Sequence, residues 1–393
     1  MSTNSAADFN DKKVIASILF CGVIALLTFL LLPLYVGAMA DKYGFSESQL
    51  GILASMDLGG IALMSLSGPF WIKRLNWRKV MRYSLVWLTI WNMVTVYTSD
   101  FGLLCLVRFL AGLGGGLMAS LVIQSISYTL NPDRVAAIYI VLQVAIQSAA
   151  FLVLPGLIID FGLLGFFGLL SIMGVLALAV TGYFPLTGLD DDVGDDANAE
   201  KRAGDSPISP LLILLGMAFF FIAQVALFSF VERMGVEAGF SSQQIGDALT
   251  IAVTVGLGGA ILGAVVSVRY GRLLPILLAG IAQLACFIFM SPNIDLLTYT
   301  LLMCGFQFFW NLPLGYHVGV LIGEDKHHRF VLLIPFIQAL GISIGPFLGG
   351  YALEFGGYDG LIGLACAALV FYLLLFVPKA RRQDKIGYAG HGQ

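Results

Sequence analysis

The chain has 393 residues, of which 59% are hydrophobic and 11% charged, with a formal net charge of −3 and a mean hydropathy of +0.91. Soluble domains carry about 25% charged residues, so this composition excludes a water-soluble enzyme and a basic nucleic-acid-binding protein. We expect a multi-pass membrane protein, located in a cell membrane such as the bacterial inner membrane, with the lipid bilayer as its solvent.

The predicted elements are all helices. A helix that crosses a membrane needs about 20 apolar residues. The first run of this kind, Val14–Ala40, is too long for the core of a signal peptide, so we expect it to be retained. The sequence predicts twelve spans, at residues 14–38, 48–70, 80–98, 102–127, 135–158, 162–185, 209–231, 244–267, 273–291, 296–322, 330–352 and 358–378.

Basic residues indicate the orientation, because lysine and arginine gather in cytoplasmic loops. Of the 21 basic residues, only Lys42 and Arg233 fall on the side opposite the N-terminus, and Arg108 falls within a span. Both termini are therefore predicted to be cytoplasmic. The predicted organisation is a tail at 1–13, a six-helix bundle at 14–185, a cytoplasmic linker at 186–208, a second six-helix bundle at 209–378 and a tail at 379–393.

The loop between the bundles is acidic and reads LTGLDDDVGDDANAEKRAGDSPIS. Its run Asp190–Asp196 is typical of a solvated linker, whereas a membrane enzyme with a metal here would need a second acidic cluster near the membrane. The five cysteines lie inside apolar runs without CxxC spacing, which is typical of packing residues. We predict no metal, no cofactor and no enzymatic activity.

A short phrase occurs twice, as GFSESQLG at Gly44–Gly51 and GFSSQQIG at Gly239–Gly246, 195 positions apart. Each copy contains an S-x-x-Q capping box between apolar staple positions, which predicts the start of a helix. The same offset relates Arg74 to Arg269, Arg134 to Arg329 and Gln143 to Gln338, and a shift of one position relates IDFG (159–162) to LEFG (353–356). The sequence therefore predicts two parallel repeats of six helices.

Twelve spans in two such halves resemble the major facilitator superfamily over essentially the whole chain. The family's G-x-L-x-D-R-x-G-R-K loop matches PFWIKRLNWR (69–78), where Arg74 is kept and Lys73 replaces the acid. The second copy, AVVSVRYGR (264–272), keeps Arg269, Gly271 and Arg272. The resemblance implies that these residues take part in closing and opening the transporter.

Two further motifs carry the resemblance. RFLAGLGGG (108–116) resembles the family's R-x-x-x-G-x-G-x-G pattern, which implies a link between Arg108 and proton coupling or substrate charge. GISIGPFLGG (341–350) resembles the family's Gly-Pro bend, here in the eleventh span rather than the fifth. Small residues spaced by four let helices pack closely, so packing or hinge roles are predicted for Gly112, Gly116, Gly345, Pro346 and Gly349.

Polar groups present in only one repeat are the candidates for function. Asp57 corresponds to Ala252 and Arg108 to Met303, and charge inside a membrane is costly. At ~1.5 Å per residue they lie roughly 16 Å and 10 Å from the same side, close enough to pair. They are candidates for proton coupling, with a static ion pair as the alternative. His317 is a third candidate for proton relay, or a histidine at the water interface.

The spans that line the cavity in the family offer aromatic and amide side chains. We predict a substrate site in which Arg108 binds a carboxylate of the solute and amide side chains donate or accept hydrogen bonds. Its residues are Arg108, Gln143, Gln147, Gln224, Gln307, Trp310, Asn311 and Gln338. Proton-coupled uptake of a small organic solute, by a monomer, is the leading hypothesis. Proton-coupled efflux of amphipathic compounds is the alternative, and an uncoupled facilitator and a metal-dependent membrane enzyme are the competing classes.

Overall fold

The structure is a computed structural model that describes residues 8–188, 208–266, 269, 271–325, 330 and 333–390. The linker residues 189–207, with the Asp190–Asp196 run, and Arg329 lie outside the described residues. The first half contains α1 (Lys12–Leu30), α2 (Leu32–Tyr43), α3 (Glu47–Trp71), α4 (Trp77–Tyr97), α5 (Phe101–Ser127), α6 (Pro132–Phe161) and α7 (Leu163–Val180). The second contains α8 (Ile208–Glu237), α9 (Ser242–Val266), α10 (Leu273–Phe289), α11 (Leu296–Asn311), α12 (Leu314–Glu324) and α13 (Ile334–Gly390).

The all-helical membrane fold is confirmed: eight of the described helices are long and apolar enough to cross a bilayer. Four predicted runs differ in detail. The first is divided at Leu31 between α1 and α2, and the tenth at Leu312 between α11 and α12. Proline follows each break, at Pro33 and Pro313, where it has no backbone N–H to continue the helix. The last two runs form one element, α13, which bends at Gly357 (φ 61°).

The helix starts are built from local hydrogen bonds. Both predicted capping boxes are confirmed: Ser46 N donates to Gln49 Oε1 at 3.0 Å, and Ser241 N donates to Gln244 Oε1 at 2.9 Å. In both boxes the serine hydroxyl accepts from the glutamine N–H. These bonds satisfy backbone donors that the first helical turn leaves unpaired.

The turns between helices also repeat. Gly44 and Gly239, 195 positions apart, have φ of 60° and 84°. Gly162 and Gly357, separated by the same offset, have φ of 58° and 61°. By conformation the partner of Gly162 is thus Gly357 rather than the Gly356 of the IDFG–LEFG match. Positive φ favours glycine, so the same backbone turn recurs in both halves.

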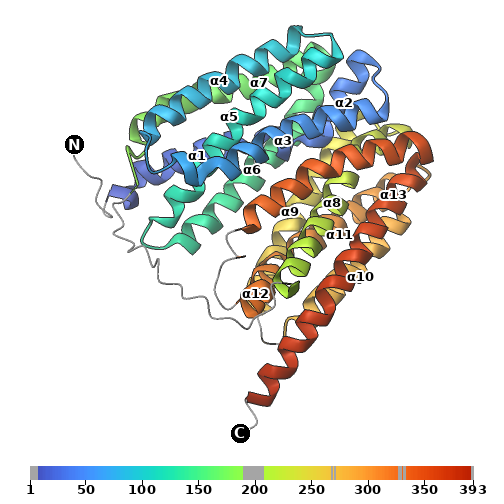
Figure 1. Cartoon of the computed structure of the whole chain (residues 1–393). Coiled ribbons are helices and arrows are strands. Elements are labelled where there is room, and N and C mark those ends of the chain that lie inside the picture. The colour runs from blue at the N-terminus through green and yellow to red at the C-terminus, as the bar shows by residue number, and fades with distance from the viewer. Residues whose placement is uncertain are drawn as a thin grey trace.

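Figure 1 shows α1–α7 as one group and α8–α13 as another, side by side. Two main seams join them, α3 against α13 and α6 against α9, and α2 also contacts α8. The last glycine of each repeated phrase lies in a seam. A Cβ on Gly51 would collide with the Pro346 carbonyl, and one on Gly246 with the Phe151 carbonyl. The repeated phrase therefore places a close backbone contact at the corresponding point of each seam.

The other glycines with predicted packing roles also lie at close approaches. A Cβ on Gly112 or Gly116 would collide with the backbone of α3, and one on Gly345 or Gly349 would crowd α8. Gly271 (φ 74°) leaves room for the Asp384 carboxylate. Arg74 and Arg269 are exposed in the loops that follow α3 and α9.

Candidate functional site

The deepest charged group of the first half is an ion pair between α3 and α5. Arg108 Nη2 lies 2.8 Å from Asp57 Oδ1, and their side chains are 0% and 3% exposed. Asp57 can approach α5 because Gly112 packs directly against the Asp57 carbonyl. The sequence left open whether these two charges pair, and in the structure they form a direct ion pair. An ion pair this deep is favourable only when its remaining polar atoms are also satisfied.

The Arg108 guanidinium is held from several sides. Its Nη1 donates to Asn92 Oδ1 at 3.0 Å and to Thr95 Oγ1 at 3.3 Å, both on α4. Its Cζ lies 5.5 Å from the Tyr35 ring centroid and 4.9 Å from that of Phe167. Aromatic faces attract cations, so these rings stabilise the charge while separating it from water.

Neither partner of the ion pair is fully satisfied, since Arg108 Nε is also buried without a hydrogen-bond partner among the described residues. Among the described residues, Asp57 Oδ2 is buried and has no hydrogen-bond partner. An unpaired buried carboxylate oxygen is costly, and a proton on it would reduce that cost. The two oxygens of Asp57 thus differ, since one faces Arg108 and the other has no hydrogen-bond partner among the described residues.

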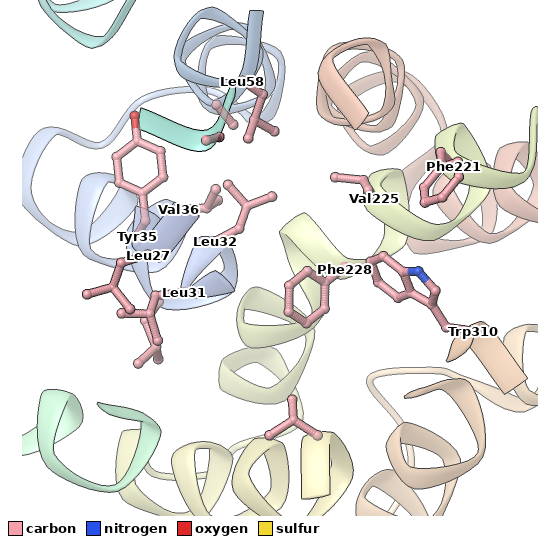
Figure 2. Close-up of a cluster of buried hydrophobic side chains, with 14 of the residues drawn as sticks. Leu27, Leu31, Leu32, Tyr35, Val36, Leu58, Phe221, Val225, Phe228 and Trp310 are labelled. Atoms are coloured by element: carbon pink, nitrogen blue, oxygen red, sulfur yellow. The ribbon is translucent and has the colours of Figure 1, made fainter. Parts of the chain in front are cut away.

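A cavity of about 610 Å³ lies between the two halves. This volume suits a small organic molecule. Two of the wall residues, Phe228 and Trp310, lie side by side in the buried hydrophobic cluster of Figure 2, across from Leu32 and Val36 of α2. The Phe228 and Trp310 ring centroids are 5.7 Å apart. The walls come from seven helices, α1, α6, α8, α9, α11, α12 and α13, and include the aromatic residues Phe29, Phe221, Phe228, Trp310 and Tyr316.

Five of the predicted substrate residues line this cavity, namely Gln143, Gln147, Gln307, Trp310 and Asn311. Gln147 Nε2 donates to the Leu30 carbonyl at 2.6 Å, which fixes its amide and leaves Oε1 as an acceptor. Asn311 Nδ2 donates to the Gln307 carbonyl at 2.9 Å. The cavity thus has aromatic walls and oriented amides on both halves.

The other three predicted substrate residues do not line the cavity. Arg108 is sealed behind Tyr35 and Phe167. Gln224 is buried in a reciprocal amide pair with Gln283. Gln338 is partly exposed on α13 outside the cavity wall. A position on a cavity-lining helix does not decide which face a side chain takes, and these residues occupy other faces.

His317 is neither in the cavity wall nor at a water interface. It is fully buried, and its Nε2 lies 2.7 Å from the Tyr372 hydroxyl. The rings of Phe220, Tyr372 and Phe376 surround it at centroid distances of 4.8, 5.2 and 5.0 Å. This environment is that of a core histidine bonded to tyrosine.

Arg272 lines the cavity, and no charged side chain other than Arg272 is among the cavity-lining residues that the structure describes. Sequence reasoning grouped it with the loop motif after the eighth span and gave it no substrate role. The signal that could have found it is its retention, beside Gly271, in the second motif copy.

The described residues contain no group of three or more His, Cys, Asp or Glu side chains that could hold a metal ion.

Comparison with known proteins gives a family and a fold. The family model of the Major Facilitator Superfamily matches residues 18–321. A bacterial homologue of the human lysosomal transporter Spinster, inward-facing, is similar to the chain both unoccupied (15% identity, TM-score 0.62) and occupied (16%, 0.65), with 94% of this chain and 96% of that chain covered in each case. The nucleoside transporter NupG has 12% identity and a TM-score of 0.67, covering 96% of this chain and 99% of that one. No curated protein matches the sequence.

Proposed function

This chain belongs to the major facilitator superfamily and is a transporter rather than an enzyme, and we propose that it drives uptake of a small organic solute with the proton gradient. In this proposal twelve spans cross a bacterial inner membrane, both termini are cytoplasmic, and the protein acts as a monomer. The two six-helix halves rock about the central cavity, so that it opens to each side in turn.

Contacts between the halves support alternating access. At the end that carries the repeated phrases, Arg233 Nη1 of α8 lies 2.7 Å from Asp41 Oδ1 of α2. Glu354 of α13 accepts from the Ser46 hydroxyl at 2.8 Å and from Ser48 N at 2.9 Å. These polar contacts cross from one half to the other. Opening the cavity toward this end requires them to break, and polar contacts near water can break at modest cost.

The observation that carries the coupling proposal is the buried ion pair of Asp57 and Arg108. Protonation of Asp57 removes the negative partner of Arg108 and frees α3 to move relative to α5. The proton is taken from the outer solution and released to the cytoplasm when the pair forms again. The unpartnered Oδ2 of Asp57 gives the proton a position that does not displace Arg108.

Purified protein in proteoliposomes tests this function. With the interior alkaline, we expect labelled solute to accumulate above its outside concentration, and an uncoupler should abolish the accumulation. Equilibration without accumulation would indicate an uncoupled facilitator instead.

Efflux of amphipathic compounds is the second candidate, and the aromatic walls of the cavity favour it. A drug-susceptibility panel on a deletion strain separates the two. Increased sensitivity to several amphipathic compounds would support efflux, whereas loss of growth on one nutrient would support uptake.

A further inference from the structure

We infer that the transported solute is an organic monocarboxylate and that Arg272 is the residue that recognises its charge. This inference rests on the proposed transport function and assigns its substrate class. The geometry also assigns the C-terminal part of α13 a positioning role, because Gln383 and Asp384 hold Arg272 in the cavity wall.

The cavity wall carries a positive charge at Arg272. Arg272 lines a largely apolar space, and no carboxylate is among the cavity-lining side chains that the structure describes. None of the ion pairs among the described residues involves Arg272. A lone cation in such surroundings attracts an anion and disfavours a cation.

Two residues of α13, Gln383 and Asp384, hold Arg272 in place. Asp384 Oδ1 accepts from Arg272 N at 2.9 Å, and Asp384 Oδ2 accepts from Leu273 N at 2.9 Å. Gln383 Oε1 accepts from Arg272 Nη1 at 2.5 Å. Gln383 Nε2 donates to the Val320 carbonyl at 2.8 Å, so the orientation of the amide is fixed. The guanidinium is thus bonded to a neutral amide, whereas the Asp384 carboxylate binds backbone N–H groups and forms no ion pair with the guanidinium.

Two glycines of α12 leave space for the side chains of Arg272 and Gln383. A Cβ on Gly319 would lie 3.2 Å from Arg272 Nε, and a Cβ on Gly323 would lie 2.6 Å from Gln383 Nε2. These glycines lie one turn apart on α12 and leave a groove for both side chains. Since Gln383 binds only Nη1, other guanidinium donors are left for a carboxylate.

The rest of the cavity wall indicates what the body of the ligand is like. Trp310, Phe228 and Tyr316 offer aromatic contact in the same cavity, and Gln143 and Gln307 offer hydrogen bonds. A single positive charge with aromatic walls suits one carboxylate on an apolar body better than a multiply charged phosphate ester. Arg108 does not serve this role, because Asp57 already neutralises it behind Tyr35 and Phe167.

Equilibrium binding without a gradient tests this inference separately from transport. The probes are monocarboxylates from butyrate to 3-phenylpropionate, each paired with its neutral amide, and the readout is the ligand-induced rise in unfolding temperature of the purified full chain. We expect at least one carboxylate to bind about tenfold more tightly than its amide, and Arg272→Gln to abolish that difference. The matched control is Arg134→Gln, which removes an exposed arginine outside the cavity wall and should retain it.

Gln383→Glu tests the positioning role. The new carboxylate should pair with Arg272 and compete with the ligand, so carboxylate affinity should fall by about tenfold while amide affinity stays unchanged. Gln383→Leu should weaken carboxylate binding less. Binding of no carboxylate, equal binding of carboxylates and amides, or a preference that survives Arg272→Gln would overturn the inference. If binding behaves as expected but accumulation fails in proteoliposomes, the coupling proposal is wrong and the recognition site stands.

Discussion

The two halves of the molecule share a fold but bury different polar groups. In the first half, Asp57 and Arg108 form an ion pair between α3 and α5. At the matching positions of the second half, Ala252 and Met303 are also fully buried, and both are apolar. The second half instead contains a buried neutral pair, in which Gln224 and Gln283 exchange hydrogen bonds of 2.9 and 2.7 Å.

The difference shows that the fold does not require charge at this depth. The second half packs the equivalent space with alanine and methionine, so the ion pair of the first half is not a packing necessity. In the amide pair, each side chain donates one hydrogen bond to the other and accepts one from it. Asp57 Oδ2, in contrast, has no hydrogen-bond partner among the described residues. We therefore propose a functional role for this ion pair, which is costly, incompletely satisfied and present in one repeat only.

Removing one partner of the ion pair should have the largest effect. Arg108→Met leaves Asp57 buried without its counter-charge, and we expect a loss of about 3–5 kcal/mol in unfolding free energy. The double variant Asp57→Ala with Arg108→Met reproduces the second half, so it should recover most of that stability and still fail to accumulate solute. Thermal unfolding in detergent measures the first effect. A double variant as unstable as the single one would show that the fold does require the charges.

The amide pair should give a smaller effect with a different pattern. Gln224→Leu strands the Gln283 amide and should cost about 1–3 kcal/mol, and adding Gln283→Leu should restore most of it. Gradient-driven accumulation should persist in the double variant, because neither glutamine takes up or releases a proton. Loss of accumulation in a stable double variant would contradict the contrast between the halves.

The seams offer the smallest effect. Glu354 bonds to the start of α3, whereas Asp160, its counterpart by the sequence match, is one methylene shorter and makes no hydrogen bond to the start of α9 among the described residues. Because Glu354 is exposed, we expect Glu354→Gln to change the exchange rate by no more than about fivefold. Asp160→Asn is the control and should have no effect. Equal effects in initial-rate measurements would mean that the seams are latched alike.

Sequence patterns predicted the helices, the capping boxes and the proximity of Asp57 to Arg108, because each depends on local spacing or on a strong energetic penalty. They did not predict the breaks at Leu31 and Leu312, since a proline near a break can also be absorbed as a kink. The twelve-span layout and the orientation of the termini stay predictions.

The candidate site was predicted only in part. Five of the substrate residues line the cavity, but Arg108 and Gln224 are turned into their own half. The direction of a side chain depends on the rotation of its helix against its neighbours, which a single sequence does not specify. Arg272 was missed because its neighbours Gln383 and Asp384 lie more than a hundred positions away in the chain.

The central claim is that Asp57, with Arg108, couples transport to protons, and Asp57→Asn in proteoliposomes tests it most directly. Asparagine keeps the shape of the side chain but cannot take up and release the proton. We predict that the variant loses accumulation under an inside-alkaline gradient and retains exchange of labelled for unlabelled solute at a rate within a few-fold of the wild type. Accumulation that persists in Asp57→Asn and still collapses with an uncoupler would contradict the account.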